Sequence, residues 1–202
     1  MKKQNKQLLK LLKNHYFWIS LIFLLFGIAV NQISSVYLKI KYKDSLPILN
    51  DLLLDNLPFY KIAWLYDIFV IFPVLIFLIY VYYKKTPQIP YLLVVFGISQ
   101  LLRGIFIVLT PFGSPFGNYV GLFDSTWMRS GVYPSGHVAT AFLTFLLTQS
   151  KLKWLNLAFT IGIIITLLLT RGHYSIDIFS ALIFSYAVFK FSETSLKSKL
   201  LP

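Results

Sequence analysis

Residues 153–191 read KWLNLAFTIGIIITLLLTRGHYSIDIFSALIFSYAVFKF. Two apolar segments, 153–170 and 173–191, are separated by Arg171 and Gly172, and the second begins with His173 and carries Asp177 four residues later. Each segment is about as long as a helix that crosses a membrane, which needs roughly 17–25 residues. This stretch therefore predicts two membrane helices joined by a turn in which polar side chains gather.

The same kind of apolar segment recurs through the chain. The full set of segments is 16–38, 62–83, 90–111, 136–150, 153–170 and 173–191. The chain of 202 residues is 57% hydrophobic and 13% charged, whereas a soluble domain has about 25% charged residues. We therefore predict an all-α integral membrane bundle of six transmembrane helices, formed by a single domain over residues 16–191.

Basic residues near the chain ends and in the loops predict the orientation of the bundle. Residues 1–15 form a basic amphipathic segment that we expect on the membrane surface, and residues 192–202 form a tail. With the N-terminus inside, twelve basic residues fall on the inner side and seven on the outer side. The positive-inside rule then predicts that both termini are cytoplasmic. Membrane topology thus explains the net charge of +12, and we expect no nucleic-acid partner.

The first candidate motif is YPSGHVAT, which leads directly into the fourth apolar segment. A helix that begins here presents free backbone N–H groups near Ser135 and Gly136, and such a helix start binds anions. His137 falls in the first turn, where an imidazole can donate a proton to a leaving oxygen. A histidine that only caps the helix start is the alternative interpretation.

The second candidate motif is TRGHYSID, Thr170 to Asp177. His173 and Asp177 are four residues apart, so they share one face of a helix. A carboxylate beside one imidazole nitrogen fixes the tautomer and leaves the other nitrogen free to attack. Arg171 lies at the turn between the two segments. The alternative is a structural polar cluster at a helix end.

Arg103 lies inside an apolar segment, in LLRGIFIVLTP. A charge within a membrane span costs about 2.5–3.5 kcal/mol or more near the middle, so it needs a partner. A lipid phosphate would be such a partner, since the guanidinium offers a rigid fork of donors. The alternative partner is Asp67 in the second apolar segment, in a structural ion pair.

The candidate residues are predicted to lie at a common depth. At 1.5 Å per residue, His137 lies about 20 Å from Lys151, and Asp177 lies about 20 Å from Lys190. Both lysines are on the predicted inner side of a membrane core about 30 Å thick. The candidate residues therefore converge slightly below the outer surface, at the level of a lipid phosphate.

These motifs resemble a known family. PSGH at 134–137 and the His173-x-x-x-Asp177 pair look like the second and third motifs of the type 2 phosphatidic acid phosphatase superfamily. RGHYSID is similar to the HY-[ST]-[IV]-D signature of its sphingomyelin synthase branch. The resemblance covers about residues 45–185.

The resemblance implies six transmembrane helices and a phosphohistidine intermediate, with no metal or other cofactor. It implies that His173 is the nucleophile, that Asp177 orients it, and that His137 protonates the leaving group. Arg103 and Arg171 would hold the phosphate.

Two departures leave the subfamily open. The phosphatase pattern has an arginine six residues before the nucleophile, where this chain has Leu167, so Arg171 takes that role as in the synthase branch. Synthases usually carry a cysteine-glycine-aspartate stretch before their serine-glycine-histidine. This chain has SGVYPSGH and no cysteine, which is closer to a phosphatase.

The loop over residues 118–133 is a candidate head-group site, with Asp124, Trp127, Arg129 and Tyr133. Aromatic rings near a carboxylate can hold a quaternary ammonium such as choline. The alternative is a belt of aromatic residues at the membrane interface. Arg129 either joins the phosphate site or is solvated.

We therefore expect a lipid phosphotransferase that moves a phospho-head group between lipid alcohols, with ceramide or diacylglycerol as possible acceptors. The first alternative is a phosphatase that hydrolyses phosphatidic acid or a related lipid. The second is a transporter or scaffold without enzymatic activity, in which the polar residues line a pathway. We expect a plasma or inner membrane location, with the site facing the extracytoplasmic side.

Overall fold

The structure is a computed structural model that describes residues 2–42, 45–62, 64–115 and 131–200. The described residues form helices and loops without a β-strand. The α-helices are α1 (Lys2–Leu12), α2 (His15–Tyr42), α3 (Leu52–Asn56), α4 (Trp64–Tyr80), α5 (Ile89–Leu109), α6 (Gly136–Leu147), α7 (Leu152–Leu169), α8 (Ser175–Ser195) and α9 (Lys197–Leu200). A π-helical turn, Val81–Lys85, and a 3₁₀ turn, Thr86–Gln88, connect α4 to α5.

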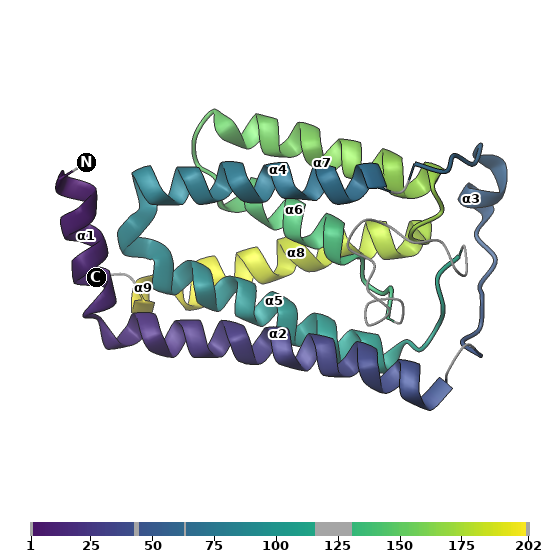
Figure 1. The fold of residues 1–202 in the computed structure, drawn as a ribbon, viewed down its shortest axis with the longest axis horizontal. Coiled ribbons are helices and arrows are strands. Elements are labelled where there is room, and N and C mark those ends of the chain that lie inside the picture. The colour runs from purple at the N-terminus through teal and green to yellow at the C-terminus, as the bar shows by residue number, and fades with distance from the viewer. Residues whose placement is uncertain (1, 43–44, 63, 116–130, 201–202) are drawn as a thin grey trace.

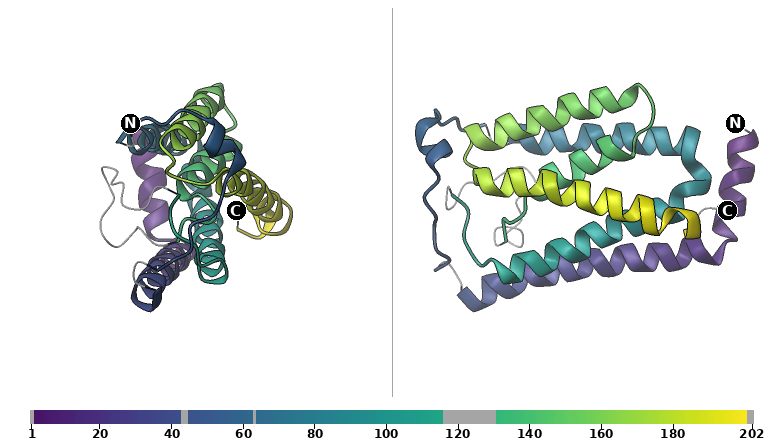
Figure 2. Two further views of the ribbon diagram at one scale, coloured as in Figure 1. Left: turned by 90° about the vertical axis from the view of Figure 1, so that its right-hand side faces the viewer. Right: turned by 180° about the vertical axis from the view of Figure 1, so that it is seen from behind.

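The long helices α2, α4, α5, α6, α7 and α8 run along the long axis of the molecule (Figure 1). Both chain ends lie at one end of this bundle, together with α1 and α9, and we call it the terminal end. The short helix α3 lies at the opposite end, which we call the α3 end. The end-on view of Figure 2 shows the helices grouped around a common axis.

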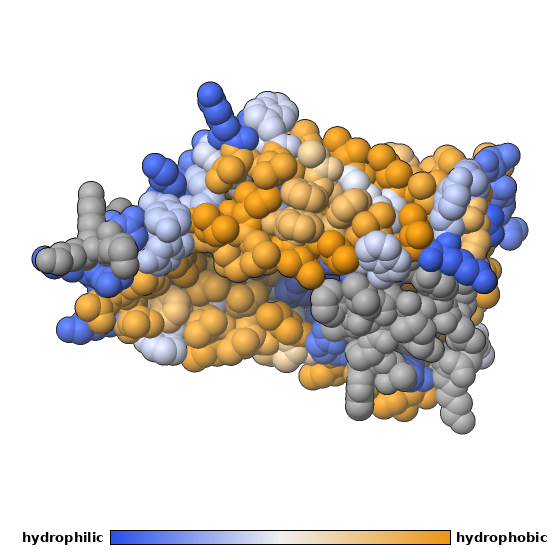
Figure 3. Space-filling view, turned by 45° about the horizontal axis from the view of Figure 1, so that its top comes forward, coloured by the Kyte–Doolittle hydropathy of each residue, from blue (hydrophilic) through white to orange (hydrophobic). Residues whose placement is uncertain are grey.

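The apolar helices indicate a membrane protein. Four runs are long and apolar enough to cross a membrane, namely His15–Tyr42, Trp64–Leu109, Leu152–Leu169 and Ser175–Ser195, and Gly136–Leu147 is a shorter apolar helix. The run Trp64–Leu109 contains α4 and α5, which are antiparallel in Figure 1. Apolar residues cover the middle of the face drawn in Figure 3, and hydrophilic residues gather toward its ends. This distribution fits a molecule surrounded by lipid.

The segment between α2 and α4 crosses the α3 end of the bundle (Figure 1). It runs without regular structure from Ser45 to Asp51 and then forms the single helix α3. Asp51 is the N-cap of α3, because its side chain accepts hydrogen bonds from the backbone N–H groups of Leu53 and Leu54. This placement fits the sequence, which is too polar and too interrupted by proline to span a membrane.

Helices α2 and α5 pack closely because glycines lie between them. A Cβ atom added at Gly27 would lie 2.5 Å from the Gly97 carbonyl oxygen, and one added at Gly104 would lie 3.0 Å from the Asn31 Cα atom. Small residues of this kind allow membrane helices to approach closely without a hydrophobic driving force. The approach brings Asn31 of α2 beside Arg103 of α5.

We predict that Gly27→Ala destabilises the protein by about 1–3 kcal/mol, because the new methyl group meets backbone that cannot move aside as a side chain can. The free energy of unfolding would be measured in detergent micelles. Gly162→Ala is the matched control, since its Cβ would meet the Phe69 ring rather than backbone. Equal stability of the Gly27 variant and the unsubstituted protein would contradict this account of the packing.

Candidate active site

The turn between α7 and α8 places His173 at the α3 end of the bundle. Helix α7 ends at Leu169, and Arg171 then adopts a φ of 52°, a conformation that glycine usually takes. The N–H of Gly172 donates to the Leu167 carbonyl at 3.0 Å, which closes the helix end. His173 follows directly and is buried.

His173 contacts Asp177 as expected, but it lies in the turn before α8 and not on the helix itself. The His173 Nδ1 and Asp177 Oδ2 atoms are 3.2 Å apart, and Oδ2 also accepts the N–H of Tyr174 at 3.0 Å. Asp177 is completely buried. Burial lowers the pKa of His173, and this effect outweighs the hydrogen bond and charge of Asp177, which raise it. The neutral, nucleophilic form of the imidazole is therefore favoured.

His137 lies in the first turn of α6, next to the second buried carboxylate of the site. Its Nε2 atom is 3.1 Å from the Asp67 Oδ1 atom of α4. The ring centroids of His137 and His173 are 6.1 Å apart. The structure therefore brings the two histidine motifs together, each imidazole with an aspartate beside it.

Asp67 is a candidate site residue that the sequence interpretation missed. We considered it only as a structural partner of Arg103, and the structure bonds it to His137 instead. An acidic residue inside an apolar segment was the available signal, but the sequence does not show which basic group faces it.

The guanidinium of Arg103 donates hydrogen bonds to three acceptors among the described residues. Its Nε donates to the Pro134 carbonyl at 2.9 Å, its Nη1 to Asn31 Oδ1 at 2.8 Å, and its Nη2 to the Gly131 carbonyl at 3.2 Å. A guanidinium has five N–H donors, so two remain beyond these three bonds to described residues. A Cβ at Gly136 would lie 3.1 Å from the Arg103 Cζ atom, so a side chain there would press against the guanidinium.

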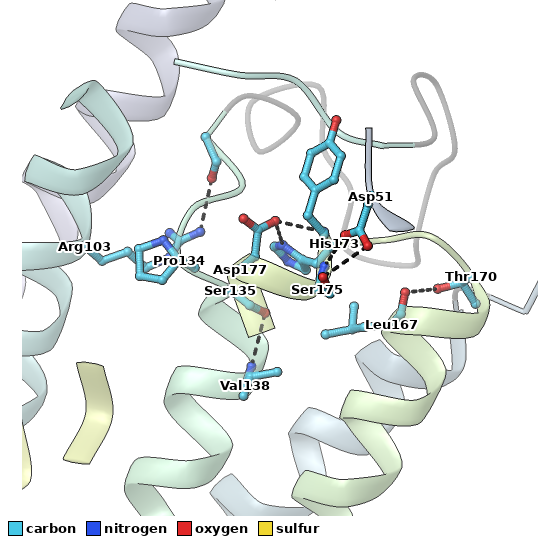
Figure 4. Close-up of polar contacts among 12 residues, drawn as sticks. Asp51, Arg103, Pro134, Ser135, Val138, Leu167, Thr170, His173, Ser175 and Asp177 are labelled. Atoms are coloured by element: carbon cyan, nitrogen blue, oxygen red, sulfur yellow. Dashed lines mark hydrogen bonds and ion pairs between the residues drawn. The ribbon is translucent and has the colours of Figure 1, made fainter. Parts of the chain in front are cut away.

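Ser135 joins the PSGH motif to the His173 turn. Its hydroxyl oxygen is the N-cap acceptor of α6, from the Val138 N–H at 3.4 Å. Its own N–H donates to the Asp177 carbonyl at 3.2 Å. Figure 4 shows Arg103, Ser135, His173 and Asp177 in this one region.

Arg171 lies on the side of the site that faces α3. Its Nη2 donates to the Leu54 carbonyl at 3.2 Å, and its Cζ atom lies 6.0 Å from the centre of the Phe59 ring. Its buried Nε has no hydrogen-bond partner among the described residues. A buried guanidinium N–H without a described acceptor is a polar group that an anion could satisfy if the turn opens to it.

Of the four candidate head-group residues, the structure describes one, Tyr133. Asp124, Trp127 and Arg129 lie outside the described residues. Tyr133 is described and partly buried, with its ring centroid 6.2 Å from that of Phe106. It also borders an apolar groove.

An apolar groove of about 740 Å³ begins beside the site and runs between α5 and α8. Its lining residues are Ile98, Leu102, Phe106, Tyr133, Pro134, Ser180, Ile183, Phe184, Ala187, Val188 and Phe191. Ile183 is 72% exposed, so the groove opens on the surface of the bundle. Pro134 connects the two features, since its side chain lines the groove and its carbonyl accepts a hydrogen bond from Arg103.

Comparison with known families finds a match in the C-terminal part of the chain. Residues 133–194 match the model of a family described as PAP2 superfamily C-terminal. No curated protein matches the chain. The matched residues include both histidine motifs, and the match supports a place in the PAP2 superfamily, which suggests lipid phosphatase or phosphotransferase activity. Arg103, Asp67 and Asn31 lie outside the matched residues.

Proposed function

We propose that this protein is a lipid phosphotransferase that moves a phospho-head group from one lipid alcohol to another through a phosphohistidine at His173. The observation that carries the proposal is the pair of histidine–aspartate contacts whose imidazole rings lie 6.1 Å apart. The Arg103 guanidinium lies in the same region and has two N–H donors beyond its bonds to described residues. Nucleophile, proton donor and anion-binding group are the parts that phosphoryl transfer needs.

In the first half of the reaction, the His173 Nε2 atom attacks phosphorus while Nδ1 stays bonded to Asp177. The bond between phosphorus and the lipid alcohol oxygen breaks, and that oxygen takes a proton from His137. The Asp67 carboxylate holds the His137 ring by Nε2, so Nδ1 is the nitrogen that delivers the proton. Arg103, Arg171 and the backbone N–H groups at Ser135 and Gly136 would stabilise the phosphoryl oxygens.

In the second half, the hydroxyl oxygen of an acceptor attacks phosphorus and its proton passes to His137. The phosphorus–nitrogen bond breaks, and His173 returns to its neutral form. A lipid alcohol as acceptor gives transfer, whereas water gives the phosphatase reaction. Burial of His173 supports transfer, because water has little access to the ring.

The groove between α5 and α8 supports a lipid substrate. From Ser180 to Phe191 it extends about 16 Å along α8 at 1.5 Å per residue, which is close to half of a membrane core about 30 Å thick. An acyl chain in the groove would bring its phosphate to the Arg103 end. Burial of each methylene contributes about 0.8 kcal/mol.

We also propose that α2, α4, α5, α6, α7 and α8 each cross the membrane and that both termini are cytoplasmic. The antiparallel course of these helices and the position of both chain ends at one end support this topology (Figure 1). Lysines of the α4–α5 and α6–α7 connections, Lys84, Lys85 and Lys151, belong to the same terminal end. The site at the α3 end would then face the extracytoplasmic side.

The proposed activity predicts a new lipid product that depends on His173. The purified protein would be reconstituted with phosphatidylcholine or phosphatidylethanolamine plus ceramide or diacylglycerol, and separately with phosphatidic acid. Mass spectrometry would measure the new lipids and an assay would measure free phosphate. We expect transfer of the head group, a loss of several orders of magnitude in His173→Ala, and a loss of about 10²–10⁴ in His137→Ala.

His15→Ala is the matched control, because His15 is an exposed histidine at the start of α2, near the terminal end. It should retain full activity. Release of free phosphate and diacylglycerol from phosphatidic acid, with no head group transferred to ceramide, would replace transfer with hydrolysis. Full activity in His173→Ala would contradict both reactions and would favour a transporter or scaffold.

If the groove between α5 and α8 binds an acyl chain, filling it should weaken activity toward long-chain lipids. Ala187→Phe should fill the groove and lower kcat/KM for a long-chain lipid about tenfold or more, since displacement of two methylenes costs about 1.6 kcal/mol. Activity toward a short-chain, water-soluble phospholipid should stay within about twofold. The matched control is Ala158→Phe, at an exposed alanine of α7 that does not line the groove. Equal effects of the two substitutions on the long-chain lipid would exclude the groove as the acyl-chain site.

A further inference from the structure

The carboxylate of Asp51 connects the segment before α3 to the turn that carries His173. Its Oδ2 atom accepts the backbone N–H of Ser175 at 2.6 Å, and its Oδ1 atom accepts the Ser175 hydroxyl at 3.1 Å. Ser175 is the first residue of α8 and lies two residues after His173. Figure 4 shows Asp51 and Ser175 bonded beside His173.

The same carboxylate also organises α3. Its Oδ1 atom accepts the N–H groups of Leu53 at 3.0 Å and Leu54 at 3.2 Å. Partial burial raises the pKa of Asp51, but the hydrogen bonds from Ser175, Leu54 and Leu53 outweigh burial and lower the pKa below its ordinary value. The charged form therefore receives four hydrogen bonds at neutral pH.

Each set of bonds leads to a different part of the candidate active site. The Ser175 bonds hold the turn in which His173 contacts Asp177. The cap of α3 sets the position of the Leu54 carbonyl, which accepts a hydrogen bond from Arg171 Nη2. One carboxylate thus fixes the nucleophile on one side and a phosphate-binding guanidinium on the other.

A second bond between the same segments reinforces this connection. The N–H of Leu49 donates to the Tyr174 hydroxyl oxygen at 2.9 Å. Tyr174 is 1% exposed and packs against Leu54. Its backbone N–H also donates to Asp177, so it is fixed at both ends. The segment over residues 49–54 is therefore bonded to the His173 turn at two points.

We propose that Asp51 is a positioning residue that holds His173 and Arg171 in the geometry needed for phosphoryl transfer. The inference rests on the function proposed above. Asp51 does not contact the reacting atoms and acts through Ser175 and Leu54. A displacement of about 1 Å at a reacting group can cost on the order of 10²-fold in rate, so the constraint on the turn affects kcat more than substrate binding.

Asp51→Asn removes the bond from the Ser175 N–H to Oδ2 and can keep the bonds to Oδ1, which include the cap of α3. An asparagine oxygen can still cap α3, because asparagine is as good an N-cap as aspartate. Its amide nitrogen is a donor, so it cannot accept the N–H of Ser175. The matched control is Asp55→Asn, which removes the same charge from an exposed position of the same short helix.

We expect kcat of Asp51→Asn to fall about 10–100-fold with KM within about threefold, whereas Asp55→Asn stays within twofold of the unsubstituted protein. Ser175→Ala removes only the hydroxyl bond to Oδ1, which Asp51→Asn can keep, so adding it to Asp51→Asn should lower kcat further. Asp51→Glu, which restores an acceptor at greater reach, should recover part of kcat. Unchanged kcat in Asp51→Asn, or equal losses in both asparagine variants, would overturn the proposal.

A measurement without turnover separates this inference from the proposed function. The chain has three histidines, so ¹⁵N-labelled imidazole signals can be assigned by single His→Ala variants. In Asp51→Asn the His173 signal should shift while the His15 signal stays fixed, and in Asp55→Asn neither should move. If His173 shifts but no lipid is turned over, the positioning holds and the proposed function fails. A fixed His173 signal overturns the positioning, whatever the activity.

Discussion

The guanidinium of Arg103 imposes the constraint on which the site depends. It lies in an apolar helix, where a charge without partners costs several kcal/mol. Asn31 of α2 and the carbonyls of Gly131 and Pro134 supply acceptors, so one side chain joins α2, α5 and the loop before α6. The close approach of α2 at Gly27 and Gly104 makes the Asn31 contact possible. The PSGH loop is therefore positioned from a helix far from it in sequence.

The other polar side chains of the site also have hydrogen-bond partners within the apolar bundle. Each imidazole has a buried carboxylate beside it, Asp177 for His173 and Asp67 for His137. The Ser135 N–H bonded to the Asp177 carbonyl joins the two motifs directly. These contacts hold the side chains in place before a substrate arrives, which is the condition for effective electrostatic catalysis. Some N–H donors of Arg103 and Arg171 have no acceptor among the described residues, and a groove runs between α5 and α8.

The sequence predicted those features that depend on local spacing. Long apolar segments predicted the helices, and the four-residue interval predicted that His173 and Asp177 lie close together, although His173 precedes the helix. Contacts between helices could not be predicted, because side chains 70 residues apart (His137 and Asp67) or 124 apart (Asp51 and Ser175) carry no shared period. The structure accordingly assigns Asp67 to His137, where we had considered an ion pair with Arg103. The roles of these residues in catalysis stay predictions, as does any role of Asp124, Trp127 and Arg129.

The central claim is a covalent intermediate on one imidazole, and trapping that intermediate tests it most directly. The reconstituted protein would be mixed with a lipid labelled in its phospho-head group, quenched in alkali within milliseconds and digested for mass spectrometry. The account predicts that the head-group phosphoryl is found on His173 through an acid-labile phosphorus–nitrogen bond, and that Asp177→Asn lowers its amount. Label on a different residue, or steady turnover without any labelled protein, would contradict the account.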